Sequence, residues 1–235
     1  MPELIIKQPY NKFKFKCKQC ALCCRGSKII LYPFDIMALC KELSIKTSEF
    51  LKKYAYLQLD KDNILRCILK NKPICMFNKD NKCIVYEARP VRCKTFPVGR
   101  IFQENRILYT LPKIKGCSGF NSNKKQTIAE YLKLQNVNEK LEKEWSLFIL
   151  KLKKSNIPLK DKFFLTLFTK IFYDFDNEMV EKFKEKLNIK DSIEENMKLL
   201  YQAFDYFFSN FNKLKQGFKE FQDNSVNSPN KINKI

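Results

Sequence analysis

Hydrophobic and polar residues alternate with a period of two in several short stretches of the first half of the chain. Phe13 to Cys17 and Lys28 to Tyr32 have this pattern, which predicts short extended segments. Residues 56–69 and 100–111 each predict a hairpin, turning at 60–63 and 104–105. Two short helices are expected between these segments, one over 35–43 and one capped by Thr47 or Ser48.

From about residue 122 the apolar positions recur with the 3.6-residue period of amphipathic helices. Aromatic residues at this spacing favour ordinary core packing over a ligand groove. The helical segments expected are 128–152, followed by a break at Pro158, and then 163–171, 178–187 and 192–221. The fold class predicted is therefore α+β and predominantly α, with a loop-rich N-terminal module followed by a C-terminal helical domain. The corresponding boundaries are 1–121 for the module, 122–222 for the helical domain and 223–235 for a polar tail expected to fray.

All ten cysteines lie in the first 117 residues. Four of them form the motif Cys17-x-x-Cys20-x-x-Cys23-Cys24, referred to below as the knuckle. Thiolates separated by two residues can turn onto one metal ion or cluster. Neighbouring residues in an extended backbone point apart, so the pair Cys23 and Cys24 favours two adjacent sites or a polynuclear cluster. The Asn- and Asp-rich stretch between Cys75 and Cys83 predicts a tight turn that brings these two residues together.

The chain contains no histidine, so sulfur must supply the principal ligands of any metal, supported by carboxylate, phenolate or water. Disulfides would need an oxidising compartment. The N-terminal Met-Pro-Glu-Leu-Ile-Ile-Lys lacks the apolar core and cleavage site of a signal peptide, and no stretch is long and apolar enough to span a membrane. A cytoplasmic location is therefore expected, where clustered cysteines are more often metal-binding or redox-active.

The formal net charge of +20 favours anionic partners in general. Nucleic-acid binding is one alternative, because basic residues neutralise phosphates. The lysines are spread along helices and no nucleic-acid-binding motif accompanies them, so a compositional bias with solvated helix faces is the preferred interpretation.

The knuckle, together with Cys75, Cys83-Ile-Val-Tyr-Glu-Ala-Arg-Pro90 and Cys93-Lys-Thr-Phe-Pro97, resembles the YkgJ-type CxxCxxCC cysteine-cluster family, described as a zinc- or iron-chelating domain. The resemblance covers roughly residues 15–120. It also includes Asp35 at an acidic position after the knuckle, whereas Cys40 and Cys67 do not match the pattern and are interpreted as buried thiols or accessory ligands. The metal ligands that the resemblance implies are Cys17, Cys20, Cys23, Cys24, Cys75, Cys83, Cys93 and Cys117.

Eight thiols equal two four-thiolate sites, or one four-iron cluster and a second metal site. Three cysteines at ferredoxin-like gaps and the vicinal pair favour an iron–sulfur cluster slightly over zinc. Arg25, Arg89 and Arg92 are placed in the sequence to offset thiolate charge, and Arg89 is also expected to pair with Glu87 or Asp35.

The function predicted is that of a cysteine-ligated metal-binding protein. One alternative is a metal-dependent redox or protein-modifying enzyme, because a related cysteine-cluster domain occurs in flagellin lysine-N-methylases. No nucleophile–base pair, phosphate loop or S-adenosylmethionine-binding domain is recognisable, and no catalytic residue is assigned. The other alternative is a basic nucleic-acid-binding protein with a structural metal site.

Overall fold

The computed structural model describes residues 6–25, 28–71, 73–112, 115–187 and 192–217. The chain divides into two compact units, residues 1–160 and residues 161–235. This boundary falls later than the expected one after residue 121. Short strands and a larger share of helix give the α+β, predominantly α class that the sequence predicts.

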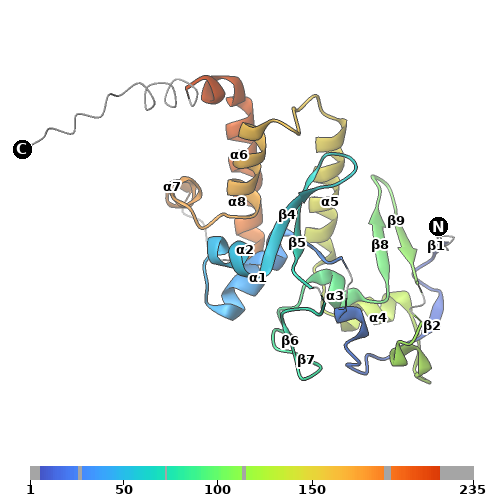
Figure 1. The fold of residues 1–235 in the computed structure, drawn as a ribbon. Helices are drawn as coiled ribbons and strands as arrows, with labels where there is room; N and C mark the ends of the chain where they lie inside the picture. Colours follow the sequence, from blue (N-terminus) through green and yellow to red (C-terminus); the bar gives the residue numbers. More distant parts are fainter. Residues whose placement is uncertain (1–5, 26–27, 72, 113–114, 188–191, 218–235) are drawn as a thin grey trace, which may run out of the picture. The chain divides into compact units, whose positions relative to one another are not determined.

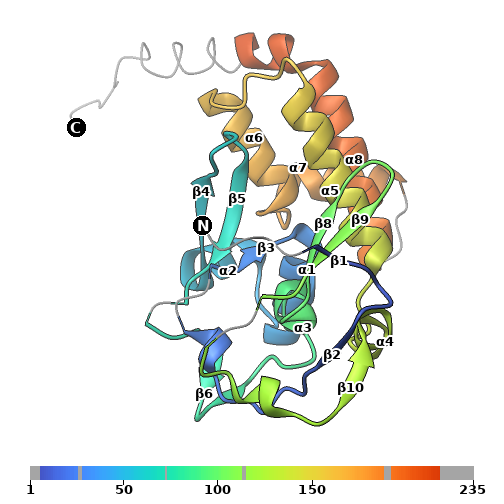
Figure 2. The ribbon, with the colours of Figure 1, turned by 90° about the vertical axis from the view of Figure 1, so that its right-hand side faces the viewer.

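The strands of the first unit form four small antiparallel sheets, in the orders β1-β9-β8, β10-β2, β3-β5-β4 and β6-β7. Figures 1 and 2 show them as separate ribbons. Their bounds are β1 Ile6–Lys7, β2 Lys12–Lys14, β3 Ile30–Leu31, β4 Ala55–Leu59, β5 Leu65–Leu69, β6 Asn78–Lys79, β7 Lys82–Cys83, β8 Gly99–Phe102, β9 Ile107–Thr110 and β10 Lys125–Thr127.

Both predicted hairpins are confirmed. In the β4–β5 hairpin, the Asp60 carboxylate accepts hydrogen bonds from the backbone N–H groups of Asp62 (2.9 Å) and Ile64 (3.0 Å) and pairs with Arg66 at 2.8 Å. A single aspartate therefore organises this turn, as the local side-chain bonding of Asx turns requires. The β8–β9 hairpin turns over residues 103–106.

The helices of the first unit begin at recognisable signals. They are α1 Pro33–Leu43, α2 Thr47–Tyr54, α3 Val91–Thr95, α4 Ile128–Leu134 and α5 Glu139–Lys154, with a 3₁₀ turn η1 at Leu22–Cys24 and another, η2, at Ser118–Asn121. Proline occupies the first position of α1, where a missing N–H costs nothing. The expected cap of α2 was wrong: Lys46 precedes the helix and Thr47 is already helical, so neither hydroxyl residue occupies the capping position.

The helix expected over 128–152 is broken in the structure. Thr127 caps α4 by accepting a hydrogen bond from the Glu130 N–H, and Asn138 caps α5 by accepting one from the Leu141 N–H. Asn136 between them has a left-handed φ of 47°. The apolar period runs through this break, which is why the sequence pattern did not indicate it.

Residues 125–134 belong to the first unit because β10 and α4 pack on its N-terminal strand β2, and α5 contacts β8 of the same unit. Lys125, Gln126 and Thr127 of β10 pair with residues 12–14 of β2. Beneath this ribbon lies a buried cluster of Phe13, Phe15, Val98, Tyr109, Cys117, Ile128, Tyr131 and Leu132. Its aromatic rings meet edge to face, with the Phe13 and Tyr131 centroids 5.4 Å apart. This core joins the strand before the knuckle to α4.

The second unit contains α6 Lys162–Phe172, α7 Glu178–Leu187 and α8 Ile193–Ser209. Asp161 caps α6 and Ser192 caps α8 through their side-chain oxygens. The helix expected over 192–221 begins as predicted, but α8 ends at Ser209; Asn210 forms a turn, and residues 211–217 are helical again. Residues 218–221 and the tail 223–235 lie outside the described residues.

Aromatic side chains of the second unit fill the contact between α6 and α8, which lie side by side in Figure 1. Phe204 of α8 contacts both Phe168 and Phe172 of α6, with ring centroids 6.3 Å and 5.6 Å apart. The expected core packing of aromatic residues at helical spacing is thus confirmed at this contact. None of the helices in the described residues combines the length and apolar character needed to cross a membrane.

Candidate metal centre

The knuckle leaves β2 and coils tightly before entering η1. Gln19 and Ala21 have left-handed φ values of 51° and 56°, and the Cys24 N–H donates to the Ala21 carbonyl at 3.0 Å. These turns allow thiols three residues apart to leave the strand direction. Cys17 and Cys20 are exposed, whereas the vicinal pair in η1 is partly buried.

A tight turn forms between Cys75 and Cys83, as the sequence predicts: Cys83 ends β7, and Cys75 lies three residues before β6, where its carbonyl accepts a hydrogen bond from the Asn78 N–H at 2.9 Å. Asp80 and Asn81 at its tip both have positive φ (51° and 61°), the conformation of a two-residue hairpin turn that Asp and Asn tolerate. Asn78 is the strand partner of Cys83. The Cys75 N–H donates to the Cys24 carbonyl at 2.7 Å, which joins this hairpin to the knuckle.

Cys93 is positioned by the short helix α3, and Asp35 holds the start of that helix. The Asp35 carboxylate accepts hydrogen bonds from the Tyr32 N–H (2.9 Å) and from the Val91 N–H (2.8 Å). Asp35 thus joins the first turn of α1 to the first residue of α3. Burial raises the pKa of the Asp35 carboxyl to about 7. Asp35, the acidic residue of the sequence motif, therefore positions the helix that carries Cys93.

Cys117 follows Gly116, whose φ of 84° favours glycine. The Lys16 N–H donates to the Gly119 carbonyl at 3.1 Å, so the Cys117 loop lies against the residue before Cys17. A Cβ on Gly119 would approach a Phe15 ring carbon to 2.6 Å. Close backbone approach at Gly119 therefore brings Cys117 to the knuckle.

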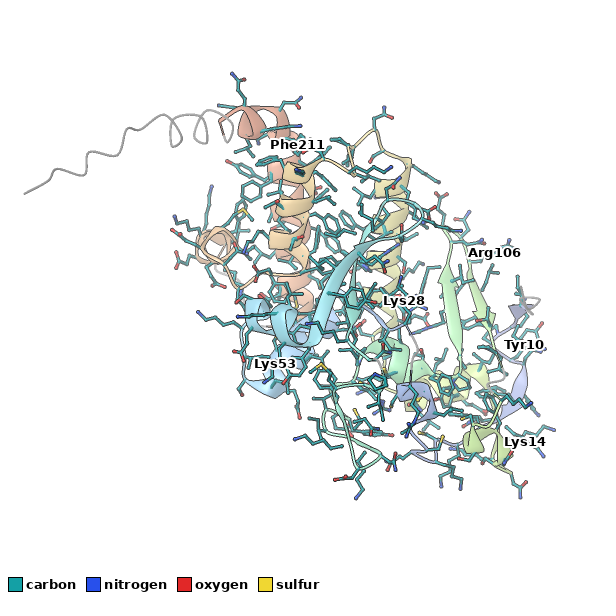
Figure 3. All side chains as sticks on the ribbon, viewed as in Figure 1. Tyr10, Lys14, Lys28, Lys53, Arg106 and Phe211 are labelled. Carbon is teal, nitrogen blue, oxygen red and sulfur yellow. The ribbon has the colours of Figure 1, made fainter. Side chains whose placement is uncertain are left out.

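The thiols form two neighbourhoods around the knuckle. Cys20 shares a side-chain hydrogen bond with Cys117, and Cys17 lies within electrostatic reach of Cys117. On the other side, Cys93 interacts electrostatically with Cys75, Cys24 and Cys83. Several yellow sulfur atoms are visible near α3 and the β6–β7 hairpin in Figure 3.

Hydrogen bonding distinguishes the two adjacent cysteines of η1. A hydrogen bond from Cys23, with further contributions from Asn78 and Arg25, lowers the pKa of Cys24 to about 6. The same pairing, together with burial, raises the pKa of Cys23. Cys24 is thus the sulfur that most readily carries a negative charge, while the Cys23 thiol is directed towards it.

Burial is the main cause that raises the pKa of Cys75, Cys83 and Cys93, and neighbouring sulfurs raise it further. Several thiols held together in this way would repel one another as thiolates. A soft cation compensates such charge, and the chemistry of the donor set therefore fits zinc or an iron–sulfur cluster.

Two of the three arginines expected to offset thiolate charge lie beside thiols. Arg25 lowers the pKa of Cys24, and Arg89 acts in the same direction on Cys83. Arg92 instead faces Tyr32. Arg89 was expected to pair with a carboxylate, but among the described residues it bonds to other groups.

The Arg89 guanidinium donates to the Tyr86 carbonyl at 2.6 Å and to the Gln135 side chain at 3.2 Å. It also lies over the Tyr86 ring, 3.8 Å from its centroid. The aromatic face and two neutral oxygens thus take the place of the expected carboxylate.

Across the described ranges, no three or more Cys, Asp or Glu side chains stand in an arrangement that could hold a metal ion. The assignment of the eight thiols as ligands therefore stays a prediction. Cys40 of α1 and Cys67 of β5 are both buried, and Cys67 lies within electrostatic reach of Cys40 and Asp35. Sequence reasoning did not identify Asn78 and Ser118, whose side chains bond to Cys24 and Cys20. Their positions within three residues of a cysteine were the available signal.

Residues 16–110 match the model of the CxxCxxCC family, whose description reads "Putative zinc- or iron-chelating domain". The match confirms the resemblance indicated by the cysteine spacing, and Cys117 lies beyond its end. Neither the curated proteins nor the solved structures contain a match to this chain.

Proposed function

We propose that this protein binds a metal centre through the thiols around its knuckle, with an iron–sulfur cluster preferred over zinc. The observation that carries the proposal is that two further segments, the β6–β7 hairpin and α3, bring cysteines towards the knuckle within the region that matches the chelating-domain family. The Cys24 carbonyl binds the Cys75 N–H, the hairpin pairing places Cys83 beside Asn78, and Asp35 orients the helix of Cys93.

The donor set supports a soft metal. Zinc, copper(I) and iron–sulfur clusters all accept thiolates, whereas magnesium and calcium prefer oxygen. The preference for iron–sulfur rests on the ferredoxin-like gaps of the knuckle and on the vicinal pair Cys23 and Cys24. A bound cluster supplies one-electron redox chemistry, while zinc supplies structural cross-linking.

The chain's own residues prepare the site. Arg25 and Arg89 provide positive charge beside Cys24 and Cys83. Asn78 donates to the Cys24 sulfur, a contact that favours its thiolate form. These groups reduce the electrostatic cost of collecting several thiolates in one place.

Anaerobic purification, metal analysis and an absorption spectrum test the proposal. We expect iron, labile sulfide and a visible absorption that bleaches on reduction. A colourless protein with stoichiometric zinc would refute the iron–sulfur preference, and a protein with neither metal would refute metal binding itself.

Two cysteine variants locate the site. Cys83→Ser is expected to lower the metal content, while Cys40→Ser is the matched control because Cys40 is a buried thiol of the same unit outside the family pattern. Equal metal content in both variants would contradict the ligand role of Cys83.

A further inference from the structure

The ribbon formed by β2 and β10 has one buried and one exposed face. Phe13 of β2 and its cross-strand partner Gln126 are both buried. Lys12, Lys14 and Lys16 take the exposed positions of the alternating segment that begins in β2. Side chains two residues apart on a strand share a face and are separated by about 6.8 Å. These three lysines therefore form a regular row on the exposed face of the ribbon.

The second strand adds another lysine to this face. Lys125 of β10 is the direct cross-strand partner of Lys14, and both are exposed. Directly opposite residues of an antiparallel pair point to the same face, with their Cβ atoms about 4.5–5.5 Å apart. Two like charges in this arrangement destabilise the strand pair. The ribbon therefore carries a repulsion that an anion on its exposed face would relieve.

Both strands of the ribbon come from segments without acidic residues. No Asp or Glu occurs from residue 4 to residue 34 or from residue 105 to residue 129, although the chain contains 25 of them. Within the described ranges, the lysines that form ion pairs belong to α5 or to the second unit. Glu130 lies within electrostatic reach of Lys12, but its carboxylate already accepts a hydrogen bond from the Thr127 N–H at 2.7 Å. Helix lysines thus find acidic partners within the chain, which the rest of the ribbon row does not.

Tyr10 presents an exposed aromatic ring beside the row. Its side chain is 70% exposed. The backbone on either side is nevertheless held in place, because the carbonyls of Pro9 and Asn11 accept hydrogen bonds from the first turn of α4 at 2.9 Å and 3.2 Å. Tyr10 and Lys14 lie along the same side of the first unit in Figure 3. An exposed ring on a fixed backbone next to a basic row is the combination by which proteins stack bases while binding phosphates.

We propose that the exposed face of the β2–β10 ribbon binds single-stranded nucleic acid, a function separate from the metal binding proposed above. The lysine row and Lys125 bind successive phosphates, and Tyr10 stacks on a base. A strand repeats its side chains at a constant interval, so the row fits a linear polyanion with regularly spaced charges. The outward positions of β2 are lysines instead of the apolar residues that anchor a protein in a membrane surface.

Fluorescence anisotropy measures this binding to the full chain, purified anaerobically. The probes are labelled oligothymidylate and oligouridylate of about 15 nucleotides, which distinguish DNA from RNA as the source of the strand. We expect the Kd to rise with salt concentration. The slope of log Kd against log salt should be about 3, because each of the four lysines contributes about 0.7 on a single strand.

Two variants separate the phosphate contacts from base stacking. Lys14→Gln is expected to weaken binding and to lower the salt slope by about 0.7. Its control is Lys143→Gln, because Lys143 is exposed on α5 and lies outside the ribbon. Tyr10→Ala is expected to weaken binding about 5- to 100-fold without changing the slope, because stacking displaces no phosphate counterion. Tyr56→Ala, which removes an exposed ring from β4, is the control for Tyr10→Ala.

Lys125→Glu separates binding from folding. A glutamate opposite Lys14 replaces a cross-strand repulsion by an attraction, so the melting temperature should stay the same or rise. The affinity should nevertheless fall further than in Lys14→Gln, because the charge is reversed. Loss of affinity in a variant of undiminished stability assigns the effect to the surface.

Several results would overturn the proposal. They are an absence of oligonucleotide binding at about 50 mM salt, ribbon variants that bind as tightly as Lys143→Gln, and ribbon-dependent binding to anionic phospholipid vesicles without binding to oligonucleotides. A duplex of equal length that binds as tightly as the single strand would overturn the stacking role of Tyr10. The metal content of the same preparations tests the proposed function independently, so the two can fail separately.

Discussion

The buried ion pair between Arg100 of β8 and Glu142 of α5 offers the sharpest test of how the first unit is held together. The two side chains are 1% and 5% exposed, and Glu142 bonds directly to the Arg100 guanidinium. Glu139, which is half exposed, lies 3.5 Å from the same guanidinium. Replacement of Glu142 by methionine would therefore leave the buried arginine paired with the half-exposed Glu139.

The loss of one partner from a buried pair costs about 3–5 kcal/mol, because the other charge stays desolvated. We expect about 3 kcal/mol for Arg100→Met and for Glu142→Met, since Glu139 and Arg92 partly compensate the charge that remains. The double variant leaves no uncompensated charge of this pair. Its loss of stability should therefore be well below the sum of the two single losses.

Urea unfolding followed by tryptophan fluorescence measures these free energies. The chain has one tryptophan, Trp145, which lies fully buried on α5, three residues after Glu142. Its fluorescence therefore reports unfolding of the first unit.

Lys154→Met is the matched control for the ion-pair variants. Lys154 of α5 pairs with Glu104 in the β8–β9 turn at 2.6 Å, but both side chains are mostly exposed. Such an exposed pair contributes little to stability, because water and salt screen both charges. If Arg100→Met is no more destabilised than Lys154→Met, or if the single losses simply add, the reasoning about burial fails.

Two further predictions concern groups near the cysteines. The folded-state pKa of Asp35 is about 7, against an ordinary value of 3.8, so the native state binds this proton more tightly than the unfolded state does. As pH rises from about 4 to 7, this difference should lower the free energy of unfolding by about 4 kcal/mol. Above pH 7 its contribution should change little. Asp35→Asn should lack this contribution, and parallel stability–pH profiles of the two proteins would contradict it. Because burial raises the pKa of Cys75, Cys83 and Cys93, metal binding should release protons and weaken as pH falls. Calorimetry in buffers of different ionisation enthalpy measures that release, and a heat independent of buffer would refute it.

Local signals in the sequence determined most of the elements. The Asn- and Asp-rich turns predicted the hairpins at 60–63 and between Cys75 and Cys83, because these side chains bond to nearby backbone and tolerate left-handed conformations. Helical periodicity located α6, α7 and α8. The family match over residues 16–110 likewise followed from cysteine spacing, which is a local property of the chain.

Tertiary contacts decided the rest. The boundary between compact units moved to residues 160–161 because β10 pairs with β2, more than a hundred residues away, and a periodicity within one segment carries no information about such a partner. The role of Asp35 was equally hidden, since its bond to Val91 spans 56 positions. Spacing grouped the four knuckle cysteines as one motif, whereas the fold directs Cys20 towards Cys117 and Cys24 towards Cys75, because each segment's partner is set by packing across the whole unit.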